Sequence, residues 1–148
     1  MSGKNEIIME FSSNSENESL ARTVISAFVA RLDPTLEELA DIKTAVSEAV
    51  TNAIIHGYEK NPGMVRMAAK IEDNVVSVEI SDTGAGIENL EKAMEPMYTT
   101  KPELDRSGMG FAFMEAFMDS VEVESAPGEG TSVTMKKEIV HTANKYER

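Results

Sequence analysis

Residues 47–58 read Ser-Glu-Ala-Val-Thr-Asn-Ala-Ile-Ile-His-Gly-Tyr, and this stretch is the most informative one in the chain. Its polar residues Glu48, Asn52 and His56 recur at every fourth position. On a helix each step of four residues rotates the side-chain direction about the axis by only ~40°, so these side chains form one polar ridge opposite an apolar row. The same spacing is also typical of a solvated helix face, and a histidine beside Gly57 at a helix end is more often structural than catalytic.

The flanking sequence predicts that this stretch ends a long helix. Asp33 is the expected N-cap, Pro34 the first helical residue and Gly57 the expected end. The apolar row of this helix comprises Leu36, Leu39, Ile42, Val46, Ala49, Ala53 and Ile54. Before it, a short strand is predicted at 6–12, and a first helix follows with Ser15 and Glu18 as a capping box.

The rest of the chain predicts strands around a long irregular segment. The expected elements are a hairpin of strands at 64–71 and 75–81, a helix at 111–118, and two last strands at 121–125 and 131–137. From Asp82 to Gly110 the sequence loses its period, and so long a loop in a small domain is usually a functional lid. A short helix near 89–94 is expected inside it, and the tail from about residue 138 is expected to fray.

The composition limits the class of protein. The chain, residues 1–148, is expected to form a single domain, since ordinary domains have roughly 100 to 200 residues. Its net charge of −12 opposes nonspecific attraction to nucleic acid or to an anionic membrane. With no cysteine and only two histidines, disulfides, thiolate metal sites and histidine cages are excluded. No signal-like or membrane-spanning stretch is recognisable, so a cytoplasmic location is expected.

A second motif, Asp82-Thr83-Gly84-Ala85-Gly86, directly follows an apolar strand. An aspartate at a strand end accepts a hydrogen bond from an exocyclic amine, and glycines spaced by one residue let a ligand approach the backbone. An ordinary strand-to-loop turn has the same composition, so the motif alone leaves both interpretations open.

Two further glycine motifs occur in the second half of the chain. The sequence Ser107-Gly108-Met109-Gly110-Phe111 places glycines before a helix, where free N–H groups and the helix dipole favour phosphate. The sequence Gly128-Glu129-Gly130-Thr131 precedes the last strand, where the threonine hydroxyl could reach a base. A glycine-rich helix start and a hairpin turn are the alternative interpretations.

The order of these motifs is more specific than any one of them. An ExxxN helix, DxGxG after a strand, a long lid, GxG before a helix and GxGT before the last strand resemble the GHKL superfamily of ATP-binding domains. The resemblance covers the chain to about Lys137 and implies an α+β fold, a two-layer α/β sandwich of the GHKL (Bergerat) type. In such a fold a mixed, mostly antiparallel sheet is covered on one face by helices and carries a long ATP lid.

Longer segments carry a closer resemblance. Residues 15–19, 47–58, 99–104 and 106–111 are similar to those of the anti-sigma F factor family of spore-forming bacteria. Members of this family are serine protein kinases that also hold a sigma factor inactive. The resemblance implies a protein that binds and inhibits a sporulation sigma factor (sigma F) and uses Mg-ATP to phosphorylate a serine on an anti-anti-sigma factor antagonist.

The resemblance also assigns roles on the helix and in the lid. Asn52 corresponds to the protein ligand of Mg²⁺, and Glu48 to the general base for the serine hydroxyl. The cofactor-binding residues implied in the lid and just after it are Thr99, Thr100, Lys101, Arg106, Ser107, Gly108, Met109 and Gly110, of which Gly108 and Gly110 would give backbone donors. Among these, Lys101 and Arg106 would offset the phosphate charge.

The remaining cofactor-binding residues implied by the resemblance surround the adenine. Asp82 would contact the exocyclic amine, and Gly84 and Gly86 would let the base and sugar approach. Thr131 would support the base through its hydroxyl or through a water molecule.

Partners are implied by the resemblance alone. Arg22 on the first helix corresponds to a surface used for both the sigma factor and the antagonist, although a solvated arginine is the plain alternative. A homodimer is also implied, with the first strand and helix as the candidate interface.

A non-catalytic ATP-sensing regulatory module remains the second hypothesis, but such a module needs no base such as Glu48. Chaperone or repair ATPases append a further domain, and sensor histidine kinases carry a separate dimerisation helix pair with a phosphoacceptor histidine. Neither feature is recognised in this sequence, so both classes are disfavoured.

Overall fold

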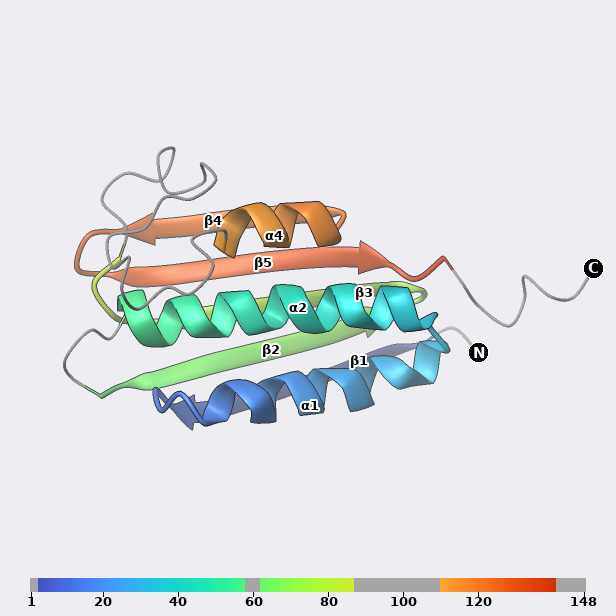
Figure 1. Cartoon of the computed structure of the whole chain (residues 1–148), viewed down its shortest axis with the longest axis horizontal. Coiled ribbons are helices and arrows are strands. Elements are labelled where there is room, and N and C mark those ends of the chain that lie inside the picture. The colour runs from blue at the N-terminus through green and yellow to red at the C-terminus, as the bar shows by residue number, and fades with distance from the viewer. Residues whose placement is uncertain (1–2, 58–61, 87–109, 141–148) are drawn as a thin grey trace, which may run out of the picture.

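The computed structural model describes residues 3–57, 62–86 and 110–140, which form two layers (Figure 1). One layer is a five-stranded sheet, and helices lie across one of its faces. In chain order the elements are β1 (Lys4–Ser12), α1 (Asn17–Val29), the 3-10 turn η1 (Ala30–Leu32), α2 (Leu36–Asn52), the π-helical turn η2 (Ala53–Gly57), β2 (Met64–Glu72), β3 (Val75–Asp82), α4 (Gly110–Phe117), β4 (Ser120–Ala126) and β5 (Gly130–Glu138). The expected α+β sandwich is confirmed. Of the helices described, none is both long and apolar enough to cross a membrane.

The sheet has the strand order β1-β2-β3-β5-β4. The predicted hairpin is the pair β2–β3, which turns at Asp73 with a left-handed φ of 55°. A mixed sheet was the expectation, but every neighbouring pair of the described strands is antiparallel. The reason is the position of β5, which lies between β3 and β4 and separates these two strands that run in the same direction (Figure 1).

The core lies between the sheet and the helices. Along β3 the side chains of Val76, Val78 and Ile80 are buried and alternate with partly exposed neighbours, as expected for a strand with one covered face. The alternation continues to Asp82, so the last residue of β3 turns a carboxylate toward the covered face. From the helix layer, α2 buries Ile42, Ala45, Val46, Ala49 and Val50.

The start of α2 differs from the predicted one. Asp33 has a left-handed φ of 53° and follows η1, so it lacks the extended conformation that an N-cap needs. Thr35 is extended and accepts a 2.9 Å hydrogen bond from the N–H of Glu38, whose carboxylate accepts one of 3.0 Å from the N–H of Thr35. This capping box replaces the predicted cap and leaves Pro34 outside the helix. The expected end at Gly57 is confirmed by η2.

The capping box predicted at Ser15 and Glu18 is wrong. Helix α1 begins at Asn17, and its N-cap residue Glu16 makes no side-chain cap. The carboxylate of Glu18 instead accepts a 2.6 Å hydrogen bond from the hydroxyl of Ser47 on α2. The side chain of Glu18 therefore links the two helices and does not cap the start of α1.

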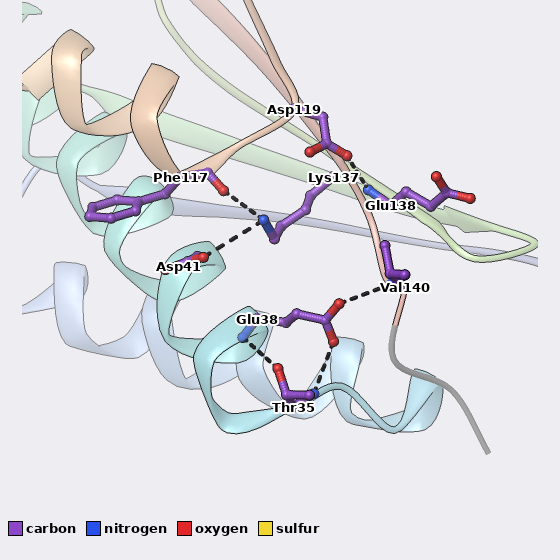
Figure 2. A network of polar contacts seen from close by, with 8 residues as sticks. All are labelled: Thr35, Glu38, Asp41, Phe117, Asp119, Lys137, Glu138 and Val140. Atoms are coloured by element: carbon purple, nitrogen blue, oxygen red, sulfur yellow. Dashed lines mark hydrogen bonds and ion pairs between the residues drawn. The ribbon is translucent and has the colours of Figure 1, made fainter. Parts of the chain in front are cut away.

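A polar network joins β5 and α4 to the first half of α2 (Figure 2). The ammonium of Lys137 donates a 2.8 Å hydrogen bond to the carbonyl of Phe117 and lies 3.7 Å from a carboxylate oxygen of Asp41. Beyond β5, the N–H of Val140 donates a 2.9 Å hydrogen bond to the capping residue Glu38. These contacts fasten the last turn of α4 and the end of β5 to one side of α2.

The chain stays packed beyond the point where fraying was expected. Ile139 is fully buried, and its N–H donates a 2.8 Å hydrogen bond to the carbonyl of Asn74. The expectation of a frayed tail from about residue 138 is therefore wrong as far as Val140, because an apolar side chain in the core holds this part of the backbone. The rest of the tail, 141–148, lies outside the described residues.

Candidate functional site

Three of the motifs predicted to carry function meet at one end of the molecule. The C-terminal end of α2, the C-terminal end of β3 and the turn between β4 and β5 all lie at the left of Figure 1. Antiparallel pairing of β5 with both β3 and β4 brings the end of one strand beside the start of the next. Residues far apart in the sequence are thereby collected at one edge of the sheet.

Asp82 is the buried acidic group of this edge, with 8% of its surface exposed. Burial raises the pKa of its carboxyl, while hydrogen bonds from the backbone of Gly84 and of Thr131 act in the opposite direction. The bond from the N–H of Gly84 measures 2.9 Å. A largely desolvated carboxylate held by backbone donors is a strong, well-oriented acceptor for an N–H donor on a ligand.

Three side chains stand in line across neighbouring strands. Asp82 of β3 pairs with Thr131 of β5, and Thr131 pairs with Ser125 of β4, so all three project from the same face of the sheet. The hydroxyl oxygens of Thr131 and Ser125 lie 2.8 Å apart, and the hydroxyl of Ser125 donates a 3.0 Å hydrogen bond to the carbonyl of Gly130. A carboxylate and two linked hydroxyls therefore form a polar row at the edge of the core.

Two glycines allow the backbone segments of this edge to come together. Gly86 has a φ of +77° and Gly130 a φ of +88°. A Cβ atom on Gly86 would overlap the carbonyl of Ala126, and one on Gly130 would overlap the carbonyl of Asp82. Only glycine fits either position, so the loop after β3 packs directly against the β4–β5 turn.

The helix layer contributes Glu48 and Asn52 in the last turns of α2. Both side chains are half-buried, and Asn52 is the last α-helical residue before the π-helical turn η2. Single π-helical turns are frequent at functional sites because they change the direction of the residues that follow. The side chain of His56, predicted to be structural, lies outside the part of the chain described in side-chain detail.

The described part of the site offers a hard cation a neutral amide oxygen and not a cluster of carboxylates. Within residues 3–57, 62–86 and 110–140, no three His, Asp or Glu side chains gather as a metal cluster. The Mg²⁺ ligand implied by the family resemblance is Asn52, whose amide oxygen is a hard oxygen donor at this end of α2. Such a donor fits Mg²⁺, which commonly keeps several waters and takes its other ligands from phosphates.

The lid predictions fall mostly outside the described residues. This holds for Thr99, Thr100, Lys101, Arg106, Ser107, Gly108 and Met109. Gly110 is described as the first residue of α4, which agrees with the predicted glycine-rich helix start. The structure thus brings together Asp82, Gly84, Gly86 and Thr131 and leaves the lid residues as predictions.

Arg22 lies apart from the polar row, on α1. Its side chain is 43% exposed, and its Nε atom is 3.6 Å from the Glu18 carboxylate, which also accepts the hydrogen bond from Ser47. An exposed ion pair of this kind adds little stability. Arg22 therefore remains accessible for another protein.

Sequence reasoning missed two residues of the site. Ser125 carries no motif, and its role depends on the pairing of β4 with β5. Gly130 belongs to the GxGT motif but was not assigned a role, although its positive φ and its closeness to Asp82 make it essential to the local geometry. Its position directly before Thr131 was the one available signal.

The class of protein follows from this fold and site. A family model described as "Histidine kinase-like ATPase domain" matches residues 11–137, which is most of the chain. Among solved structures, the chain is similar to the RsbU and RsbW domains of a Mycobacterium tuberculosis protein, with a TM-score of 0.67 and 20% identity over 94% of this chain and 33% of that one. It is also similar to full-length ShkA in complex with AMPPNP, with a TM-score of 0.58 and 19% identity over 87% of this chain and 31% of that one. At these identities the structural likeness concerns the fold alone.

Curated relatives narrow the class. The chain is 57% identical to the anti-sigma F factor of Clostridium acetobutylicum over 136 residues, which make up 92% of this chain and 95% of that protein. It is 58% identical to the anti-sigma F factor of Geobacillus kaustophilus over 137 residues, or 92% of this chain and 94% of that protein. The chain belongs to the anti-sigma F factor family of histidine kinase-like ATPase domains.

Proposed function

We propose that this chain is an anti-sigma factor and an ATP-dependent protein serine kinase. It binds and inhibits a sporulation sigma factor of the sigma F type, and it uses Mg-ATP to phosphorylate a serine on an anti-anti-sigma factor. One observation carries the proposal beyond family membership. The buried carboxylate of Asp82, in register with Thr131, lies at the same end of the molecule as the last turn of α2, which carries Glu48 and Asn52.

The polar row supplies the proposed adenine contacts. The Asp82 carboxylate accepts a hydrogen bond from the exocyclic amine of adenine, and its burial strengthens that bond by reducing competition from solvent. Gly86 and Gly130 keep the neighbouring backbone free of side chains, so a flat base can approach this edge. Base recognition thus depends on the sheet.

The helix supplies the proposed chemistry. Glu48 accepts the proton of the substrate serine as the serine oxygen bonds to the γ-phosphorus, and the bond from that phosphorus to the bridging oxygen of ADP breaks. Asn52 binds Mg²⁺, which neutralises phosphate charge when bound. The products are phosphoserine and ADP, with the proton left on Glu48.

A direct test uses the purified chain, ATP labelled in its γ-phosphate, Mg²⁺ and a candidate anti-anti-sigma factor. The expected result is label on a serine of the antagonist and none on this chain. An antagonist whose candidate serine is changed to alanine is the matched control. Tight Mg-dependent ATP binding without transfer would contradict the kinase assignment and favour the ATP-sensing module.

We also propose that the chain forms a homodimer through β1 and α1. Strand β1 is an outer strand of the sheet and has nine residues, long enough to offer an extended surface to a second copy. Ile8 of β1 is 61% exposed and Leu20 of α1 is 47% exposed, and such apolar side chains favour burial in an interface. Sedimentation equilibrium should give twice the chain mass, and Ile8→Glu should shift it toward the monomer. A wild-type monomer would contradict this assembly.

A further inference from the structure

Lys137 is a cation on the covered face of the sheet. At the end of β5 the side chains of Met135 and Ile139 are buried, and Lys137 lies between them on the same alternating face. Its side chain is 14% exposed. An ammonium so largely removed from water must be paired or hydrogen-bonded, because its desolvation is otherwise costly. The helix layer supplies these partners, which are Phe117 of α4 and Asp41 of α2 (Figure 2).

The contact with α4 closes the C-terminal end of that helix. Phe117 is the last residue of α4, so its carbonyl is one of those that a helix leaves without an internal partner. Lys137 donates a 2.8 Å hydrogen bond to it, and a cation at this end also suits the helix dipole. Just beyond, the N–H of Asp119 donates at 2.8 Å to the carbonyl of Lys136, and its carboxylate accepts at 2.7 Å from the N–H of Glu138. The end of α4 is therefore held on β5.

The contact with α2 joins this anchor to the helix that carries the proposed chemistry. Nζ of Lys137 lies 3.7 Å from a carboxylate oxygen of Asp41, whose side chain is 25% exposed. Glu48 and Asn52 follow on the same helix, and β5 begins at the polar row. One ammonium thus connects three of the elements that form the proposed site. Without it, the Asp41 carboxylate and the Phe117 carbonyl would be left near each other as two acceptors.

We propose that Lys137 is a positioning residue of the nucleotide site, which holds α4 beside α2 so that the first turn of α4 meets the phosphates. The inference rests on the proposed function and deepens it. The first N–H groups of a helix have no partner inside it, and in α4 these belong to the turn that begins at Gly110. Lys137 lies six residues along β5 from Thr131, about 20 Å away at the usual rise, so it acts through α4 and not on the base.

The experiment separates the phosphates from the base by comparing ATP with adenosine, which has the same base and sugar and no phosphate. Dissociation constants for both ligands are measured by titration calorimetry with the full chain and Mg²⁺. Lys137→Met keeps the apolar stem and removes the ammonium, so the preference for ATP over adenosine should fall roughly tenfold, as expected for a displaced binding group. Affinity for adenosine should stay at the wild-type value, because Asp82 and Thr131 are unchanged. Lys136→Met, at an exposed lysine on the opposite face of β5, is the matched control.

The preference ratio separates positioning from a merely structural role. If Lys137 only stabilises the fold, Lys137→Met weakens both ligands by the same factor, and an unchanged ratio overturns the inference. Asp41→Asn provides a second route should Lys137→Met not fold. It removes the carboxylate that joins the ammonium to α2 and should also lower the ratio, so an unchanged ratio there would overturn the inference too. Absence of ATP binding in the wild type would instead refute the proposed function itself.

Discussion

The hydroxyl of Ser47 on α2 donates a 2.6 Å hydrogen bond to the carboxylate of Glu18 on α1. The carboxylate oxygen that accepts it also lies 3.6 Å from Nε of Arg22. Ser47 directly precedes Glu48, the proposed base, while Arg22 belongs to the proposed partner surface. One carboxylate therefore joins the helix that would meet partner proteins to the helix that would carry the chemistry.

Removal of this hydroxyl should destabilise the fold. Ser47→Ala is expected to lower the free energy of unfolding by about 1.5 kcal/mol, since the lost bond is partly buried and its acceptor is charged. Thr23→Ala is the control, because its hydroxyl donates a 2.9 Å hydrogen bond to the Ser19 carbonyl within α1, at an exposed position. Urea titration measures both variants, and equal effects would show that the link between the helices is weak.

Charge reversal at Arg22 should impair partner binding. Arg22→Glu places a second carboxylate beside Glu18 on an exposed face, so affinity for the sigma factor, for the antagonist or for both should fall. ATP affinity should stay at the wild-type value, because Arg22 is absent from the polar row. Arg31→Glu, an exposed arginine of η1, is the matched control in pull-down assays with each partner. Full retention of both partners would remove Arg22 from the interface.

Replacement of the proposed base should separate binding from catalysis. Glu48→Gln keeps the shape of the side chain but cannot take a proton, so serine phosphorylation should fall by roughly 100-fold or more. ATP binding and capture of the sigma factor should persist. Glu37→Gln in the first turn of α2 provides the control. Transfer at the wild-type rate would exclude Glu48 as the base, and loss of ATP binding would indicate a structural role.

Loss of the proposed magnesium ligand should act on nucleotide binding. Asn52→Ala is expected to abolish Mg-dependent ATP affinity, because the acidic chain cannot hold phosphates without the cation. Titration of labelled ATP with and without Mg²⁺ measures the effect. Asn5→Ala, on an exposed position of β1, should behave as wild type. An unchanged magnesium dependence in Asn52→Ala would refute the assignment.

The carboxyl of Asp82 should make stability depend on pH. Burial raises its pKa, so the folded protein holds the proton more tightly than the unfolded chain does. The stability that Asp82 contributes is therefore present below the ordinary aspartate pKa and is lost as the pH rises through the raised value. Asp82→Asn should gain stability relative to wild type as the pH rises above the ordinary aspartate pKa of about 4, while losing at least tenfold in ATP affinity. A stability difference that does not vary with pH would contradict the buried-charge account.

The strand limits follow the sequence closely, whereas the starts of α1 and α2 do not. Alternating burial on β3 is a local pattern, so the hairpin could be predicted from it. At 33–35, however, Asp33 and Thr35 are both good cap residues, and only the backbone angles decide between them. The competing use of Glu18 by Ser47, 29 residues further along the chain, has no local signal at all.

The residues of the candidate site also differ in how far the sequence predicts them. Motifs locate Asp82, Gly86 and Thr131, because each stands at the end of a strand or in a glycine turn. The hydroxyl of Ser125 enters through cross-strand register, which depends on the β4–β5 turn length and on the covered face of β4. Residues that orient a binding group are harder to predict than the binding group itself, because their partners are set by the fold.

The fastening of β5 by Lys137 and Val140 has a practical consequence for labelling. Strand β5 begins at the polar row with Gly130 and ends eight residues later at Glu138, about 27 Å away at the usual rise per strand residue. The contacts of Lys137 with α4 and α2 hold that far end in place. A fluorophore or surface tether attached beyond Val140 would start at the opposite end of the molecule from the nucleotide, which leaves the polar row open for single-molecule and immobilised binding assays.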